Sequence, residues 1–167
     1  CIAGVFGGKG SGTYETTRDV LLESAYFNPT WIRKSARRHG LSTDASFRFE
    51  RGIDPNGVIY ALKQAAMLCK ELAGGEIAME IKDVSPNPLP DFIVDLNYEY
   101  AYGLMGKNIG ADTVSSIVTS LEMKILEETA EGLKLQVPAY RVDVQRPCDV
   151  VEDILRVYGY NNVEIPS

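Results

Sequence analysis

Apolar and polar residues follow helical spacing in some parts of the chain and strand-like spacing in others, and these patterns predict its elements. A first helix is expected from Pro29, with Asn28 as its cap and Gly40 at its end, and a longer helix over residues 54–72. Apolar runs predict strands in the same region, at residues 2–6, 19–27 and 76–84. The first half of the chain is therefore predicted to be mixed α/β.

The second half shows a different order of elements. Its pattern predicts a strand at residues 92–96, a short helix at 98–105, a helix capped at Asp112, a hairpin of strands 123–128 and 133–137, and a last helix at 149–158. Two helices followed by a β-hairpin resemble a winged helix. The fold class expected of the whole chain is α+β or mixed α/β.

Three alternating prolines separate the two halves. The stretch SPNPLP, residues 85–90, disfavours helix and favours an extended linker, so we expect one domain over residues 1–88 and another over residues 91–167. Residues 1–90 carry 11 Lys and Arg against 10 Asp and Glu, whereas residues 91–167 carry 6 against 13. Because counterion release requires Lys and Arg, direct DNA binding by the acidic second domain is not expected.

Composition narrows the class of protein further. The chain has 167 residues, of which 45% are hydrophobic and 24% are charged, as is typical of a globular protein that buries a core. It shows no run of 18 apolar residues and no secretory leader, so we expect no membrane partner and a cytoplasmic location. Its three cysteines are widely spaced without a CxxC pair, which argues against a disulfide framework or a zinc site. Since the chain does not begin with Met, we expect an internal fragment of a longer protein.

Two long stretches of the sequence resemble one known family. They are VLLESAYFNPTWIRKSARRHGLSTDASFRFERGIDP, residues 20–55, and PAYRVDVQRPCDVVEDILRVYGYNNV, residues 138–163. The first is similar to the later half of the B3/B4 editing domain of bacterial phenylalanyl-tRNA synthetase β subunits, and the second is similar to their B5 domain. The resemblance implies a partial B3/B4 editing-domain layer over residues 1–88, followed by a winged-helix-like B5 domain over residues 91–167.

The same resemblance implies an enzyme and its partners. The family is part of phenylalanine–tRNA ligase, which uses ATP to attach phenylalanine to tRNA(Phe) and assembles as α2β2. Its ATP chemistry lies on the α subunit, so this fragment is expected to contain no catalytic residue, to bind no ATP and to be inactive alone. The motif FRFE, residues 47–50, matches the F-R-x-E pattern of synthetase ATP sites, but without a G-x-G-x-x-R motif we interpret it as a coincidence.

An editing pocket is the first site that the resemblance implies. Apolar binding only weakly rejects a substrate that adds one hydroxyl, and tyrosine is phenylalanine plus a hydroxyl, so a second, hydrolytic site supplies the discrimination. Glu23 matches the family's glutamate that recognises the tyrosine hydroxyl, and a carboxylate is a natural acceptor for a phenolic O–H. Gly7, Thr43 and Ala45 match positions that line the same pocket. The family's pocket also uses a histidine, and His39 lies outside that position. From the residues alone, Glu23 is more simply an exposed strand-edge carboxylate.

The second predicted site is a cluster of four carboxylates: Asp143, Asp149, Glu152 and Asp153. The last three lie at i, i+3 and i+4 of the expected last helix and therefore share a face. A magnesium ion relieves the repulsion between such groups, although an acidic first turn favoured by the helix dipole is the alternative. The resemblance implies a Mg2+ site shared with the α subunit, in which Asp153 stands where glutamate is usual. Arg141 and Arg146 are expected to pair with the cluster when no metal is bound.

The densest positive charge of the chain lies between Arg33 and Arg51. Stronger tRNA contact is expected of this basic stretch than of residues 91–167, because phosphates attract Lys and Arg. An alternative function, from a different class, is a non-catalytic interaction module whose acidic domain serves only to assemble a larger complex.

Overall fold

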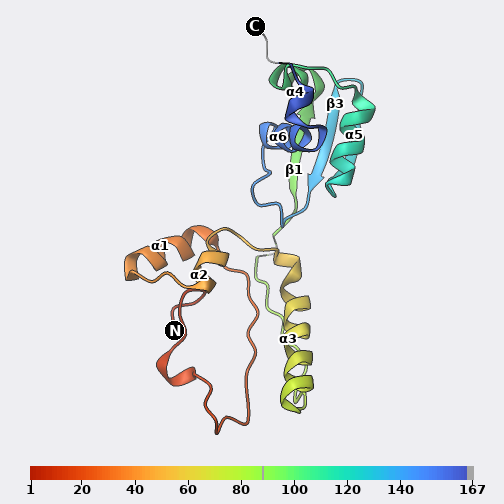
Figure 1. Ribbon diagram of the computed structural model, residues 1–167. Coiled ribbons are helices and arrows are strands. Elements are labelled where there is room, and N and C mark those ends of the chain that lie inside the picture. Colours follow the sequence, from red (N-terminus) through yellow and green to blue (C-terminus); the bar gives the residue numbers. More distant parts are fainter. Residues whose placement is uncertain (88, 165–167) are drawn as a thin grey trace. The chain divides into compact units, whose positions relative to one another are not determined.

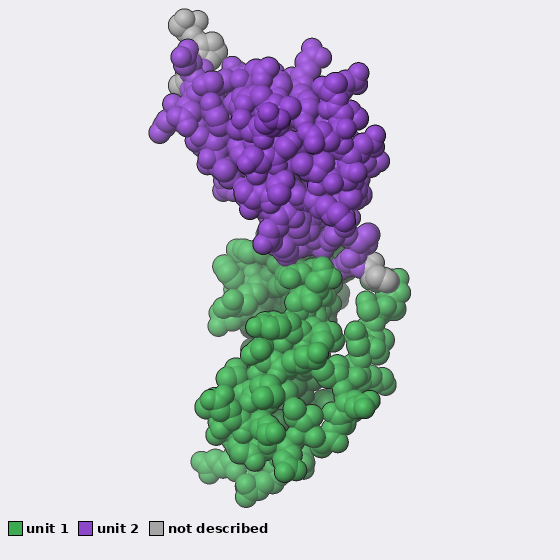
Figure 2. Space-filling view, turned by 90° about the vertical axis from the view of Figure 1, so that its right-hand side faces the viewer, with its two compact units in different colours: residues 1–88 green, residues 89–167 purple. Residues whose placement is uncertain are grey.

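The structure is a computed structural model that describes residues 1–87 and 89–164, and its chain divides into two compact units, Cys1–Pro88 and Leu89–Ser167 (Figure 2). Six α-helices and a three-stranded antiparallel sheet are present in the described part. The expected mixed α/β class is therefore confirmed. None of the described helices is both long enough and apolar enough to cross a membrane.

Unit 1 contains three α-helices. They are α1 (Pro29–His39), α2 (Asp44–Phe49) and α3 (Val58–Ala73), with short 3-10 turns at Lys9–Ser11 and Pro55–Gly57 (Figure 1). Asn28 caps α1, since its Oδ1 accepts hydrogen bonds from the backbone N–H groups of the first turn, and Gly40 ends the helix with φ of 63°. These two predicted helix ends are confirmed. The short α2 was not predicted, because six residues carry too little periodicity.

The three strands predicted in unit 1 are wrong. Residues 2–6 form a tight turn closed by one bridge between Ile2 and Phe6, and residues 19–27 and 76–84 contain no strand. An apolar run becomes a strand only when a second strand supplies backbone partners, and the described part of this unit contains no second strand. The apolar character of these runs was visible in the sequence, but the pairing was not.

A small core holds the N-terminal turn against α1. Val5, Ile32 and Ala36 are buried, and the Phe27 and Phe49 rings meet edge to face with centroids 5.0 Å apart. Gly4 has φ of 67°, and a Cβ atom there would lie 2.6 Å from Ile32 Cδ1, so only glycine fits this turn. By contrast, α3 buries none of its residues.

Unit 2 follows the predicted order of elements. They are β1 (Phe92–Asn97), α4 (Tyr98–Met105), α5 (Ala111–Ser120), β2 (Lys124–Glu128), β3 (Gly132–Val137), α6 (Pro147–Tyr158) and a 3-10 turn at Tyr160–Asn162. The strand order β1-β3-β2 places the hairpin beside β1, and α4, α5 and α6 gather around this sheet (Figure 1). One detail of the prediction is wrong: Gly110, not Asp112, is the N-cap of α5, and Asp112 lies in its first turn.

The core of unit 2 is continuous and apolar. Alternate residues of β1 and β3, including Val94, Leu96 and Leu135, face Val150 and Ile154 of α6 in one buried cluster. At Gly132 the two strands approach so closely that a Cβ atom would lie 2.1 Å from the Leu96 carbonyl oxygen. The apolar face of α6 is therefore buried in the same core as β1 and β3.

Candidate functional sites

Thr43 is the best-fixed residue of the predicted editing pocket. Its hydroxyl donates a hydrogen bond to the Val5 carbonyl oxygen over 2.5 Å and accepts one from the Ser46 backbone N–H over 3.1 Å. Ser46 Oγ in turn accepts from the Thr43 backbone N–H over 2.9 Å, which completes a capping box at the start of α2. Thr43 therefore joins α2 to the N-terminal turn.

Two other predicted pocket residues, Gly7 and Ala45, lie close in sequence to this junction. Ala45 lies exposed in the first turn of α2, two residues from Thr43, and Gly7 follows two residues after Val5. A Cβ atom at Gly7 would meet nothing within 4 Å, so this position is open. Gly7 and Ala45 thus each lie within two residues of the bond that joins Thr43 to Val5.

Glu23 lies on an irregular segment and its side chain is exposed. Its neighbour Ser24 donates a hydrogen bond to the Val58 carbonyl oxygen over 2.8 Å, which ties this segment to the start of α3. Within residues 1–87 and 89–164, no hydrogen bond or ion pair joins Glu23 to Gly7, Thr43 or Ala45. The segment that carries Glu23 is therefore tied to α3 through Ser24 and to α2 through the contact of Phe27 with Phe49.

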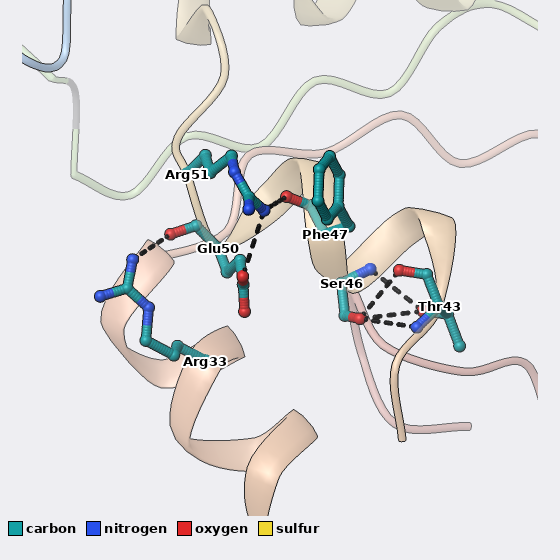
Figure 3. A network of polar contacts seen from close by, with 6 residues as sticks. All are labelled: Arg33, Thr43, Ser46, Phe47, Glu50 and Arg51. Atoms are coloured by element: carbon teal, nitrogen blue, oxygen red, sulfur yellow. Dashed lines mark hydrogen bonds and ion pairs between the residues drawn. The ribbon is translucent and has the colours of Figure 1, made fainter. Parts of the chain in front are cut away.

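Two arginines hold the end of α2, and one of them, Arg33, reaches it from α1 (Figure 3). Arg33 Nη2 donates to the Glu50 carbonyl oxygen over 3.1 Å. Arg51 Nη1 donates to the Phe47 carbonyl oxygen over 2.7 Å and pairs with Glu50 Oε1 at 3.2 Å, while its guanidinium lies 3.6 Å from the centre of the Phe47 ring. In the FRFE motif, the Glu50 carbonyl is therefore used to join α1 to α2, and Phe47 holds Arg51 at the end of α2.

Asp149 stands at the start of α6 and is held there by several hydrogen bonds. Hydrogen bonds from the Arg146 side chain, over 2.8 and 3.1 Å, and from the backbone N–H groups of Gln145 and Arg146 favour its charged form. They lower the pKa of Asp149 from 3.8 to about 2, although burial acts in the opposite direction. The same pair raises the pKa of Arg146. Asp149 thus remains an anion over the whole physiological range.

The other three carboxylates have different surroundings. Asp153 is buried, bonds to Arg141 and lies 3.7 Å from the Arg156 guanidinium, while Glu152 is exposed and lies 3.9 Å from Arg156. Asp143 is exposed on the loop before the helix. The ion pairs that the sequence predicted for Arg141 and Arg146 are present.

These carboxylates do not make a complete magnesium site by themselves. Within the described residues, no three His, Cys, Asp or Glu side chains lie close enough to share a metal ion. Three of the four carboxylates are paired with arginines instead. A magnesium ion held by several of these carboxylates would therefore require a change of partner for at least one of them.

Comparisons with known proteins find relatives over the whole chain. A family model described as the B3/4 domain matches residues 1–74, and one described as the tRNA synthetase B5 domain matches residues 94–160. The chain is also similar to phenylalanine–tRNA ligase β subunits from three bacteria. It is 73% identical to that of Bacteroides fragilis and 70% identical to that of Bacteroides thetaiotaomicron, each over 100% of the chain. It is 50% identical to that of Porphyromonas gingivalis over 99% of the chain.

Over its whole length the chain is similar to one segment of phenylalanine–tRNA ligase β subunits, with a B3/4 domain followed by a B5 domain. It spans one fifth of the length of these curated relatives, 20% in each case. The resemblance that the two sequence stretches indicated is therefore confirmed, and so are a B3/4 domain and a B5 domain in that order.

Three features of this chain were missed by reasoning from sequence. They are the buried Ser46, the bond between Thr43 and Val5, and the link from Arg33 to the Glu50 carbonyl. Thr43 is a favoured N-cap residue, and this signal was available in the sequence, although Ser46 stands where a capping box usually has Glu or Gln. The two long-range bonds were not available, because nothing local in the sequence relates residues 38 or 17 positions apart.

Proposed function

We propose that this chain is the part of a phenylalanine–tRNA ligase β subunit that contributes to hydrolytic editing and supports the catalytic partner. The complete enzyme would attach phenylalanine to its tRNA with ATP, on an α subunit in the cytoplasm. The observation that carries this proposal is the 73% identity over the entire chain, with a B3/4 domain followed by a B5 domain.

In the proposed editing role, unit 1 supplies part of a pocket for the tyrosine of mischarged tRNA. The small and open positions Gly7 and Ala45 leave room for an aromatic ring, and Thr43 keeps the turn and α2 in contact. Glu23 would accept the phenolic hydroxyl, a group that phenylalanine lacks. Its exposure is compatible with a site that is completed by the remainder of the subunit and by the substrate.

In the proposed support role, unit 2 presents Asp143, Asp149, Glu152 and Asp153 toward a magnesium ion shared with the α subunit. Magnesium prefers octahedral oxygen ligands and keeps several waters, so a few carboxylates from each chain are sufficient. Of the four carboxylates, Glu152 would bind magnesium most readily, because its side chain is 62% exposed and its Oε1 lies 3.9 Å from Arg156 Nε. Asp153 is the least accessible.

A second candidate function is supported by the ion pairs of unit 2. With Asp149 and Asp153 already neutralised by arginines, the acidic domain could assemble with a partner protein without metal. In this role it acts as a non-catalytic interaction module of a larger complex.

The proposed editing role is tested by Glu23→Ala and Glu23→Gln in the full-length β subunit assembled with its α subunit. Loss of a charge-assisted hydrogen bond to the substrate should slow hydrolysis of Tyr-tRNA about 10- to 100-fold and leave phenylalanine charging nearly unchanged. Glu15→Ala, which removes another exposed carboxylate from the same irregular segment, is the matched control. If both Glu23 variants clear Tyr-tRNA like the control, the pocket assignment is wrong.

A further inference from the structure

The outward face of α1 carries an exposed aromatic residue among cations. Ile32 and Ala36 are buried against the core of unit 1, so the opposite face of the helix points to solvent. Trp31, Lys34 and Arg38 lie on that face at i, i+3 and i+7, with Arg37 beside them. Trp31 is 65% exposed, and all three cations are exposed.

The structure separates cations that hold the fold from cations that do not. Arg33 and Arg51 are engaged with backbone carbonyls and with Glu50, as described above. Lys34, Arg37 and Arg38, by contrast, have no carboxylate within ion-pair distance in residues 1–87 and 89–164. Their positive charge is therefore available to a ligand.

The helix dipole accounts for only part of this arrangement. Cations are favoured in the last turn of a helix, where Arg37 and Arg38 lie. The dipole gives no reason for Lys34 nearer the middle, nor for an exposed tryptophan in the first turn. Lys34 Nζ lies 4.9 Å from the centre of the Trp31 ring, so charge and aromatic surface form one continuous patch.

We propose that Trp31, Lys34, Arg37 and Arg38 form an RNA-binding face, in which the three cations contact phosphates and Trp31 stacks on an unpaired base. A polyanion whose bases offer flat π surfaces matches both parts of the patch, whereas an acidic protein surface would use only its charge. This inference rests on the proposed function in one respect, since it takes tRNA as the RNA.

The test uses the full-length β subunit assembled with its α subunit and labelled tRNA, with binding followed by fluorescence anisotropy at several salt concentrations. The triple variant Lys34→Gln, Arg37→Gln and Arg38→Gln should bind about 10-fold more weakly at low salt. The slope of log K against log salt should fall in magnitude by about 2, because each lost phosphate contact removes roughly 0.7 to 0.9. Trp31→Ala should weaken binding about 10-fold without changing that slope.

Two further variants separate charge from folding. The first is a triple variant that keeps the charge: Lys34→Arg, Arg37→Lys and Arg38→Lys. It should bind tRNA with the same slope of log K against log salt as the wild type. Arg33→Gln removes a cation that joins α1 to α2, and should lower the thermal midpoint while changing the slope by less than the triple variant does. An unchanged slope in the glutamine variant overturns the proposal and favours an acidic protein partner. Equal loss of binding in the charge-keeping variant also overturns it.

The result is independent of the editing pocket. Glu23→Ala leaves α1 untouched, so normal hydrolysis of Tyr-tRNA by that variant would refute the pocket alone. Reduced salt dependence in the glutamine variant would then still support the RNA-binding face.

Discussion

The Thr43 hydroxyl donates a hydrogen bond to the carbonyl oxygen of Val5, a residue 38 positions earlier in the chain. The same oxygen caps α2 by accepting from the Ser46 backbone N–H. One side chain therefore both starts a helix and fixes the N-terminal turn, next to two residues of the predicted editing pocket, Gly7 and Ala45.

Removal of this hydroxyl should destabilise unit 1. In Thr43→Val the shape is kept, but the Val5 carbonyl and the Ser46 N–H lose their partner, which should lower the free energy of unfolding by about 1–3 kcal/mol. Urea denaturation followed by circular dichroism measures the change. Thr30→Val, at an exposed position in the first turn of α1, should change stability by less than about 0.5 kcal/mol. Equal effects of the two substitutions would show that the bond to Val5 contributes nothing.

A large side chain at position 45 should block editing without unfolding α2. Ala45 is exposed in the first turn, so Ala45→Trp meets solvent in the free protein but would occupy the space proposed for the substrate ring. We expect hydrolysis of Tyr-tRNA by the complete enzyme to be lost and mischarging to rise, while the thermal midpoint stays unchanged. Ala45→Ser keeps a small side chain at this position; it is the control and should edit nearly normally. If the tryptophan variant edits at the control rate, Ala45 does not line the pocket.

The Asp149 ion pair predicts how unit 2 responds to acid. The pKa of Asp149 is lowered from 3.8 to about 2 by its bonds to Arg146 and to backbone N–H groups. As the unfolded chain takes up this proton first, the stabilisation is complete above pH 3.8 and is lost as the pH falls toward 2. Unfolding of the wild type between pH 5 and 2 should therefore be steeper in pH than that of Asp149→Asn.

A neighbouring carboxylate provides the control for this measurement. Asp143 is exposed and has no cation within ion-pair distance among the described residues. Asp143→Asn should retain the acid dependence of the wild type. A shallower curve for Asp143→Asn, with no change for Asp149→Asn, would contradict the assignment.

Magnesium dependence should identify the proposed shared site. Asp149→Ala and Glu152→Ala should each raise the magnesium concentration needed to keep the α and β subunits assembled, as measured by light scattering. Glu128→Ala removes an exposed carboxylate from β2 and should assemble like the wild type. Should all three variants assemble alike at every magnesium concentration, these carboxylates form a solvated, arginine-paired surface.

Several elements were predictable because their causes are local. Asn28 and Gly40 delimit α1 through bonds and backbone angles within a few residues, and the alternation of β1 and β3 reports which side chains face the core. In unit 2 the three predicted strands pair with one another, so the strands expected from the apolar pattern are present in the structure. The residues of the carboxylate cluster were also visible, together with their two nearest arginines.

Other features depended on the tertiary structure, because they involve contacts between residues that are distant in sequence. The runs at 2–6, 19–27 and 76–84 have strand-like composition, but a strand also requires a partner with free backbone groups, which composition does not report. In the basic stretch, the sequence shows six similar cations from Arg33 to Arg51. Only packing decides that Arg33 reaches the Glu50 carbonyl while Arg38 faces solvent, because the buried Ile32 and Ala36 set the rotation of α1.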